Sequence, residues 1–415
     1  MFPFVALLAF ALSQSAYALP YPVIQFNNAS LARLPVAKTI AASSALHLVT
    51  SDRARTARLK AMGTAAATGT PFTEAALASV PAVNQAVTYT VNVSVGEPAT
   101  IFSLIVDSGS SNTWVGAGTP YEPTSTSENT GDLVEVQYGS GLFLGEEFTD
   151  TVTLGNNITV ANQSIGVATE SEGFNGVDGI LGIGPVALTQ GTLSSDSTLE
   201  IPTFTDNLFS EGLIDDNLVA VSFEPTTTAD ATNGELTFGG IDTTKFNGNI
   251  TYAPITATTP SSEFWGIDQS VSYGNQTILN LTAGIVDTGT TLVLIATDAF
   301  DAYQTATGAV LDQTTGLLTI TDDQLINLDS LYFDIAGTTF ELTPNAQLWP
   351  RALNTAIGGT ADGIYLIVSD LGTPSGQGLD FINGQSFLER FYAVFDTTNQ
   401  QVGIATTDFT TATSN

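Results

Sequence analysis

Two short motifs in the sequence carry the residue types needed for carboxylate chemistry. Ile105–Gly116 reads IVDSGSSNTWVG and Ile285–Ile295 reads IVDTGTTLVLI, so an Asp-Ser/Thr-Gly unit follows Ile-Val twice, 180 positions apart. Each apolar run that ends in such a unit is typical of a buried strand entering a tight turn. One such aspartate alone would be interpreted as a turn residue. The repetition predicts that Asp107 and Asp287 form a functional pair.

The residues that follow each aspartate suit a shared site. Gly109 and Gly289 would let the two turns approach closely, and the hydroxyls of Ser110 and Thr290 can each donate a hydrogen bond to the adjacent carboxylate. Two carboxylates held close together cannot both ionise easily, so they share one proton. One then acts as a base toward a bridging water while the other polarises a substrate carbonyl.

The composition excludes several other chemistries. The chain has no cysteine, so neither disulfides nor thiol catalysis contribute. Its single histidine is His47, in the N-terminal part of the chain. If that part is removed, Ser-His-Asp and Cys-His catalysis are impossible. His-ligated zinc is excluded in the same way, and we expect neither a metal nor a cofactor.

The charges are divided unevenly along the chain. Six of the nine basic residues precede residue 61, where Asp52 is the only acid, whereas only three basic residues follow Glu74. The acidic body should repel nucleic acid and anionic membranes, and protonation of its carboxylates in acid would relieve its self-repulsion. A basic segment ahead of an acidic body is what an intramolecular electrostatic clamp would need. The alternative is a solvated linker with incidental charge, and we favour the clamp.

The first 75 residues have the features of segments that are removed by processing. Residues 1–18 have a short apolar core and an Ala16-x-Ala18 site, which predicts a secretory signal peptide and an extracellular protein. Residues 19–75 form a basic propeptide, in which Ser51 is suited to cap a short helix ahead of an exposed Ala/Gly/Thr linker. Candidate glycosylation sequons begin at Asn157, Asn162, Asn249, Asn275 and Asn280.

The remaining sequence predicts an all-β protein of two related lobes, residues 76–245 and 246–415. Alternating strand-like runs and turns dominate, and DGILGIG at Asp178–Gly184 has a weaker counterpart in DFINGQSF at Asp380–Phe387. We expect short helices only, at Thr203–Gly212, Thr297–Gly308 and Thr321–Leu328. The two catalytic aspartates would then meet in a cleft between the lobes.

These motifs resemble those of the pepsin family of aspartic proteases, in which the shared proton of an aspartate pair is well documented. The resemblance covers about residue 76 to the C-terminus. Its residues are Asp107-Ser108-Gly109-Ser110, Tyr138-Gly139-Ser140-Gly141, Asp287-Thr288-Gly289-Thr290 and the terminal FLERFYAVFDTTNQQVGIA. It implies a bilobal fold, a monomer, and hydrolysis of peptide bonds in proteins at acid pH without a cofactor.

The resemblance also implies roles for individual residues. Asp107 and Asp287 match the catalytic pair, with Ser108, Gly109, Ser110, Thr288, Gly289 and Thr290 as their supporting frame. Tyr138 matches the aromatic residue of a flap that closes over an extended peptide substrate, with backbone contacts from Gly139 and Ser140. Trp114 matches its tryptophan partner, and Ile285 and Thr291 line subsites. In the basic segment, Lys60, and second Lys38, match the lysine that blocks the cleft of a zymogen.

The chain departs from the family pattern at two places. Ser108 stands where most relatives have threonine, and Ile382–Gln385 reads INGQ where a Leu-Gly-Asp type of sequence is usual. Two other functions remain open at this stage. One is a catalytically silent binding protein on the same fold, which would usually have lost an aspartate or the flap tyrosine. The other is a secreted glycoside hydrolase with two carboxylates, which would not explain the twin hydroxyl frames.

Overall fold

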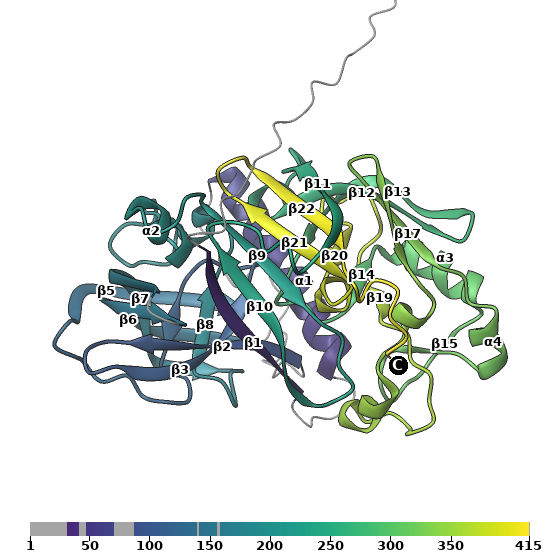
Figure 1. The fold of residues 1–415 in the computed structure, drawn as a ribbon, viewed down its shortest axis with the longest axis horizontal. Helices are drawn as coiled ribbons and strands as arrows, with labels where there is room; N and C mark the ends of the chain where they lie inside the picture. The colour runs from purple at the N-terminus through teal and green to yellow at the C-terminus, as the bar shows by residue number, and fades with distance from the viewer. Residues whose placement is uncertain (1–30, 41–46, 70–86, 139–140, 156–157, 415) are drawn as a thin grey trace, which may run out of the picture.

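The computed structural model describes residues 31–40, 47–69, 87–138, 141–155 and 158–414. The signal-peptide prediction for residues 1–18 and the flap residues Gly139 and Ser140 lie outside these ranges, as does the sequon at Asn157. The described residues form two β-rich lobes with a few helices (Figure 1). This agrees with the predicted all-β class.

The larger sheet has thirteen strands that run from the first lobe into the centre of the molecule. In spatial order its strands are β11 (Asn247–Pro254), β22 (Gln401–Thr406), β21 (Phe391–Asp396), β9 (Leu218–Phe223), β10 (Asp230–Phe238), β1 (Ala32–Ile40), β2 (Val87–Val95), β3 (Thr100–Asp107), β8 (Gly179–Gly182), β4 (Trp114–Val115), β7 (Ile158–Glu172), β6 (Gly141–Leu154) and β5 (Glu128–Tyr138). The strands β21 and β22 come from the end of the chain, so this sheet joins the two halves of the sequence.

The second lobe is built on a seven-stranded sheet. Its strands, in spatial order, are β18 (Thr338–Leu342), β17 (Leu331–Ile335), β12 (Gly266–Tyr273), β13 (Gln276–Val286), β20 (Phe381–Asn383), β14 (Val293–Ile295) and β19 (Val368–Asp370). A separate pair is formed by β15 (Val310–Leu311) and β16 (Leu318–Thr319). Short 3-10 helices cover Val186–Thr189, Ser261–Glu263, Asn345–Gln347 and Arg351–Ile357.

The internal echo in the sequence corresponds to equivalent strand pairs in the two lobes. In the first lobe, β3 carries Asp107 and pairs in parallel with β8, from the DGILGIG segment. In the second lobe, β13 ends at Val286 and pairs in parallel with β20, from the DFINGQSF segment. The Ile-Val pairs before both aspartates are buried. Two buried strand ends of the same construction therefore deliver the two aspartates.

Three helices form where the sequence predicts them, with ends within two residues of the predicted bounds. Helix α2 (Phe204–Ser210) has a capping box between Thr203 and Asp206, and α4 (Asp322–Ile326) has one between Thr321 and Gln324. Helix α3 (Thr297–Thr307) ends at Gly308 in the left-handed conformation. A further short helix, α5 (Gln385–Leu388), follows β20.

The basic segment is more ordered than the sequence predicts. Helix α1 (His47–Thr68) has 22 residues, so Ser51 lies inside it rather than at its start. The helix continues into the first five residues of the stretch interpreted as an exposed linker, Thr64–Thr68. Alanine is the strongest helix former, and the Thr64 and Thr68 hydroxyls bond back to the carbonyls of Lys60 and Thr64 at 2.7 and 2.8 Å. The prediction of a short helix followed by a linker was therefore wrong up to Thr68.

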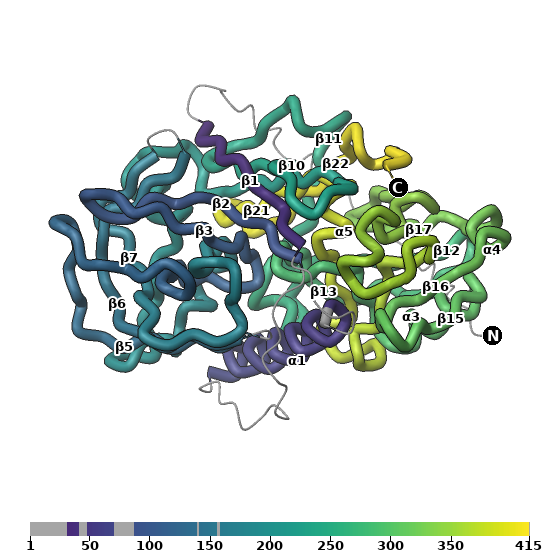
Figure 2. The backbone as a smooth tube through the Cα atoms, turned by 90° about the horizontal axis from the view of Figure 1, so that it is seen from below, coloured from purple at the N-terminus to yellow at the C-terminus, as the bar shows by residue number. Residues whose placement is uncertain are grey.

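Both parts of the basic segment are built into the molecule. Strand β1 lies between β10 and β2 in the large sheet, and its residues alternate between buried and more exposed positions. Helix α1 lies across the junction of the two lobes (Figure 2). Residues 47–69 thus lie at the junction of the two lobes that carry the Asp-bearing turns, whereas residues 32–40 form a strand inside the large sheet.

Candidate active site

Each catalytic candidate is held by its own turn in the same way. The backbone N–H of Gly109 donates to Asp107 Oδ1 at 3.0 Å, and the Ser110 hydroxyl donates to Oδ2 at 2.6 Å. The equivalent bonds to Asp287 come from the backbone of the glycine and the hydroxyl of the threonine in DTGT, at 3.1 and 2.6 Å. Both carboxyl groups are at most 1% exposed. Two fixed, buried carboxylates of matching orientation result.

The two turns are also bonded to each other across the lobes. The Ser108 backbone N–H donates to Thr288 Oγ1, and the Thr288 backbone N–H donates to Ser108 Oγ, both at 2.9 Å. The threonine hydroxyl donates onward to the carbonyl of Val106 at 2.9 Å. The serine that replaces the usual threonine therefore keeps the reciprocal bond, because only the hydroxyl takes part in it.

Glycine is required at the point where the turns meet. A Cβ atom added to Gly109 would lie 2.8 Å from Asp287 Oδ1, and one added to Gly289 would lie 2.6 Å from Asp107 Oδ1. Such contacts are closer than carbon and oxygen atoms tolerate without displacement. The glycines thus let each carboxylate approach the opposite turn, as the spacing predicts.

A single arginine from α1 occupies the space between the two aspartates. Arg55 Nε donates to Asp287 Oδ2 at 2.7 Å, and Nη2 donates to Asp287 Oδ1 at 2.9 Å and to Asp107 Oδ1. Burial opposes the ionisation of Asp287, but the guanidinium and the turn donors together hold its pKa below the usual value. Burial likewise opposes the charge of Arg55, and the two carboxylates outweigh it and raise its pKa. One cation therefore bridges the two acids and balances one of their two negative charges.

The two lysines proposed for this role lie elsewhere, so both proposals for a dyad-binding lysine were wrong. Lys60 lies further along α1 and donates to Thr373 Oγ1. Lys38 lies on β1 and forms a buried ion pair with Glu389, which also accepts a hydrogen bond from the Tyr89 hydroxyl at 2.8 Å. The α1 surface that faces the aspartates carries Arg55 instead, since the helix begins earlier than predicted and its phase decides which cation faces the dyad.

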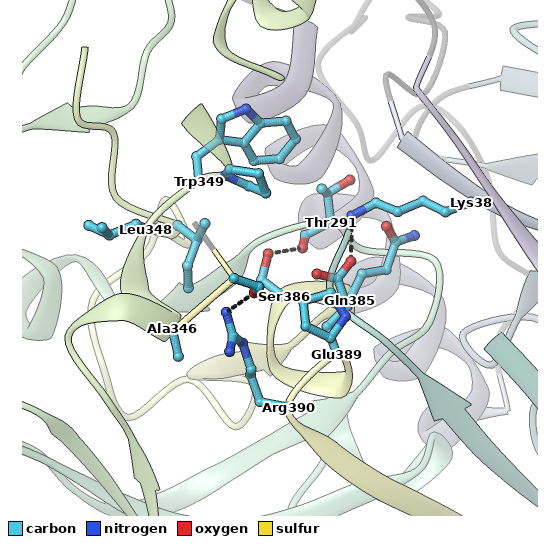
Figure 3. A pocket seen from close by; sticks show the side chains of 13 residues that line it. Lys38, Thr291, Ala346, Leu348, Trp349, Gln385, Ser386, Glu389 and Arg390 are labelled. Atoms are coloured by element: carbon cyan, nitrogen blue, oxygen red, sulfur yellow. Dashed lines mark hydrogen bonds and ion pairs between the residues drawn. The ribbon is translucent and has the colours of Figure 1, made fainter. Parts of the chain in front are cut away.

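Lys38 belongs to a different pocket from the aspartates. Figure 3 shows it reaching Glu389 at a small pocket that Thr291, Gln385 and Ser386 also line. Gln385 is the last residue of the unusual INGQ sequence, and its Nε2 donates to the Thr288 carbonyl at 2.9 Å. Its Oε1 has no hydrogen-bond partner among the described residues. Although the INGQ sequence differs from the usual family pattern, its glutamine still supports the second Asp-bearing turn through this hydrogen bond.

Asp52 is a second contact that sequence reasoning missed. It lies one turn before Arg55 on α1, and its carboxylate accepts hydrogen bonds from the backbone N–H groups of Thr291 and Leu292 at 3.2 and 2.9 Å. Burial raises its pKa to about 7, and the two N–H donors and Arg55 limit that shift. The one feature of the sequence that pointed to a role for Asp52 is that it is the only acid in the basic segment. Nothing in the sequence distinguished Arg55 from the neighbouring cations.

The described part of the flap packs as an aromatic cluster. Trp114 Nε1 donates to the Tyr138 hydroxyl at 2.9 Å, and the indole stacks on Phe143 with ring centroids 4.4 Å apart. Phe174 meets both the tryptophan and the tyrosine edge-on. Tyr138 ends β5 and forms a small cavity with α1 residues, among them Leu59. The tyrosine is thus held near the aspartates by its partner tryptophan.

The two residues expected in subsites are placed differently. Thr291 follows the second catalytic turn and offers its backbone N–H toward α1, as described above. Ile285 is only 1% exposed and lies in the main hydrophobic core, where it pairs with Gly266 and Ile382. We conclude that Ile285 supports the wall of the site in this structure, while Thr291 borders the space that α1 fills.

The sequence and the solved structures of other proteins place this arrangement in a known class. The chain matches the model of the eukaryotic aspartyl protease family over residues 88–407. The chain belongs to this family, the pepsin-like aspartic endopeptidases, and it has their two-lobe fold. This membership removes the glycoside hydrolase alternative.

Two relatives and one solved structure indicate how similar the chain is to known enzymes. It is 65% identical to polyporopepsin of Irpex lacteus over 341 residues, which cover 82% of this chain and all of that protein. It is 30% identical to human gastricsin over 335 residues, which cover 76% of this chain and 80% of that one. The crystal structure of the aspartic proteinase from Irpex lacteus matches with a TM-score of 0.80 and 56% identity, covering 93% of this chain and 100% of the other.

Two further observations concern the described residues only. None of their helices is long and apolar enough to cross a membrane. They also contain no group of three or more His, Cys, Asp or Glu side chains that could hold a metal ion. In the part of the chain that the structure describes, the polar groups around the dyad are carboxylates, hydroxyls, backbone amides and the guanidinium of Arg55.

Proposed function

We propose that this protein is a secreted acid endopeptidase made as a zymogen, with residues 19–75 as its intramolecular inhibitor. The observation that carries the proposal is the contact of Arg55 with both catalytic carboxylates. A guanidinium in this position excludes the water and the substrate carbonyl that the reaction needs. The family match begins at residue 88, after both α1 and β1, which supports a removable role for this segment.

Once α1 leaves, Asp107 and Asp287 share one proton in the proposed mechanism. The ionised partner takes a proton from a water held between the two carboxyl groups, and that water attacks the carbonyl carbon of the peptide bond. The protonated partner donates to the carbonyl oxygen as the tetrahedral intermediate forms. The hydroxyls of Ser110 and Thr290 keep each carboxyl group in its plane. Proton transfer to the leaving nitrogen then completes hydrolysis.

The substrate in this proposal is a peptide in extended conformation. It would lie in the space that α1 fills, under Tyr138, and make strand-like backbone contacts with Gly139 and Ser140 of the flap and with Thr291. The N–H of Thr291 supports this, because it already binds the carboxylate of Asp52 on α1. The enzyme would act as a monomer, since both aspartates come from one chain.

The domain boundaries follow from the same proposal. Residues 1–18 would be a signal peptide, 76–245 the lobe with the first aspartate and the flap, and 246–415 the lobe with the second. The candidate sequon residues among the described positions are all exposed, which supports glycosylation of a secreted chain: Asn162, Asn249, Asn275 and Asn280. Secretion is tested by the N-terminal sequence of protein collected from the medium.

The catalytic assignment is tested with two variants, Asp107→Asn and Asp287→Asn. Each should lower the rate of hydrolysis of a denatured protein at about pH 4 by at least about 1,000-fold, since each removes one acid/base partner. A statine-type transition-state analogue should block the unmodified enzyme. Asp334→Asn, an exchange on β17 where the carboxylate bonds Thr339, is the matched control and should leave the rate unchanged. Full activity in either active-site variant would contradict the mechanism.

A further inference from the structure

One other cation of α1 is held by the cleft wall in a specific way. Arg53 lies two residues before Arg55, and its Nη2 donates to Asp370 Oδ2 at 2.8 Å while its Nε donates to the Asp370 carbonyl at 3.0 Å. The other carboxylate oxygen, Oδ1, accepts from the Thr297 hydroxyl at 2.7 Å and from the Gly372 N–H at 2.8 Å. The wall thus fixes one oxygen of the carboxylate and turns the second toward α1.

Removal of α1 would leave this second oxygen without its cation. Among the described residues, Arg53 is the one side chain that bonds Asp370 Oδ2. The Asp370 side chain is 15% exposed while the arginine is in place, and the arginine side chain is 46% exposed. The Asp370 carboxylate is therefore partly desolvated. A partly desolvated carboxylate that has lost its cation is stabilised when another cationic group takes the place of that cation.

The strand pairing relates Asp370 to the turn that carries Asp287. Asp370 ends β19, directly beside Ile295 of β14, and β14 is the strand that follows this turn in the chain. On α1, Arg53 contacts Asp370 and Arg55 contacts the two catalytic aspartates. A long side chain of a peptide that occupies the space filled by α1 can therefore reach Asp370.

We propose that Asp370 forms a subsite for a lysine or arginine side chain of the peptide substrate. This inference rests on the proposed proteolytic use of the cleft and names part of its substrate class. Neighbouring Lys60 does not define a second such subsite. Among the described residues, its side chain donates a hydrogen bond to the hydroxyl of Thr373, and burial lowers its pKa to about 8 although Asp380 opposes the shift.

The test uses the acid-processed enzyme and sets of quenched fluorescent peptides. Each set places lysine, its uncharged isostere norleucine, or glutamate at one of the two positions on either side of the cleaved bond. At one position, kcat/KM for the lysine peptide should exceed that for the norleucine peptide by about five-fold, the scale of a partly exposed ion pair. In Asp370→Asn this ratio should fall to about one, while cleavage of the norleucine peptides stays within about two-fold of the unmodified enzyme.

Asparagine is a conservative probe here because its Oδ1 can still accept from Thr297 and Gly372. Asp334→Asn on β17, outside the cleft, is the control for loss of one surface charge. Should Asp370→Asn not fold, the unmodified enzyme still decides the matter. The lysine preference should fall by about half or more at 1 M salt, where exposed charges are screened.

The outcomes separate the two proposals. Equal kcat/KM for lysine and norleucine at every position, or a lysine preference that survives in Asp370→Asn, would overturn the cationic subsite and leave the protease intact. No cleavage of any peptide, neutral ones included, would overturn the proposed proteolytic function and the subsite with it. A preference for lysine that disappears in Asp370→Asn but not in Asp334→Asn supports the assignment.

Discussion

Arg55→Ala is the substitution that most directly tests how α1 keeps the cleft closed. Arg55 is itself buried and bonds two carboxylates that are at most 1% exposed. Removing one partner of a buried, hydrogen-bonded ion pair costs about 3–5 kcal/mol, mostly because the other charge is left unpaired. Here the two aspartates can share a proton, which relieves part of that cost. We therefore expect α1 docking to weaken by about 3 kcal/mol, which corresponds to about a 150-fold larger open fraction.

The open fraction is measured as the activity of the intact chain before any processing. At about pH 6.5, the initial rate of cleavage of a quenched peptide reports the molecules in which α1 has left the cleft, while gel analysis shows that the chain is uncut. Arg53→Ala is the matched control, because that arginine is on the same helix but half exposed. We expect it to raise the rate by no more than about five-fold. Arg55→Lys should fall between the two, since one ammonium cannot reproduce the fork that meets both carboxylates.

We call the activity of the uncut chain the leak. Its pH dependence follows from the direction in which the pKa of Asp287 is shifted. Its pKa lies below the ordinary value of 3.8 when α1 is docked, because the Arg55 contacts outweigh burial. Docking of α1 is therefore stabilised at pH values above the pKa that Asp287 has in the open cleft. This stabilisation is lost as the pH falls through the lower pKa that Asp287 has when α1 is docked. The unmodified chain should open on acidification below about pH 4, and Arg55→Ala should show much less change there. If the leak of Arg55→Ala at pH 6.5 is within about three-fold of the leak of the unmodified chain, the proposed role of Arg55 is refuted.

Two other buried carboxyl groups predict pH effects of the opposite sign. Asp52 has a pKa raised to about 7 by burial, so its contribution to docking is present below pH 3.8 and is lost as the pH rises through 7. Asp52→Asn should strengthen the docking of α1 at about pH 8 by about 2 kcal/mol, which lowers the activity of the uncut chain about 30-fold, and should leave it unchanged at pH 4. An equal activity of the uncut chain at pH 8 would contradict this. Burial also raises the pKa of Glu147 to about 7, and its Oε2 has no hydrogen-bond partner among the described residues. Glu147→Gln should raise the midpoint of thermal unfolding at about pH 8 by about 3 °C with no change at pH 4, and calorimetry that finds equal midpoints at pH 8 would contradict it.

The sequence predicts the catalytic pair because its signal is local and repeated. An apolar strand, an aspartate, a hydroxyl residue and a glycine are adjacent in the chain, and each turn builds the bonds around its own carboxylate. Between the lobes, the two turns are joined by the reciprocal bonds of Ser108 and Thr288, and the glycines of the same motifs permit the close approach. The helix ends at α2 and α4 are predictable for the same reason, since a capping box spans four neighbouring residues.

The contacts of the basic segment are not local, and there the prediction fails. Six cations lie between residues 33 and 60, and all are chemically able to meet a carboxylate. Which of them does so depends on the phase of α1 and on where the helix begins, both of which are set by packing against the two lobes. Charge complementarity thus predicts the clamp as a whole, and the fold selects Arg55 as the residue that contacts the dyad.

Strand β1 was missed for a related reason. Pro35 and two cations argue against a central strand, because proline cannot donate to a neighbouring strand. The register explains why it is tolerated. β1 pairs with β10 along most of its length, but with β2 only from Ala37 onward. Pro35 therefore faces no partner on the β2 side, and the register shift after Val36 lies between the two parts.

The two parts of the basic segment are held by different interactions, and this decides which of them responds to acid. β1 is held by backbone hydrogen bonds to two strands and by the buried pair of Lys38 with Glu389. α1 is held at its centre by Arg55, whose partners are the two aspartates of the proposed reaction. Catalysis requires one proton to be shared between those aspartates, and that same proton removes half of the negative charge that attracts Arg55. In the proposed zymogen, the protonation that makes the pair competent is therefore also the protonation that weakens its inhibitor, and α1 should leave the cleft before β1 leaves the sheet.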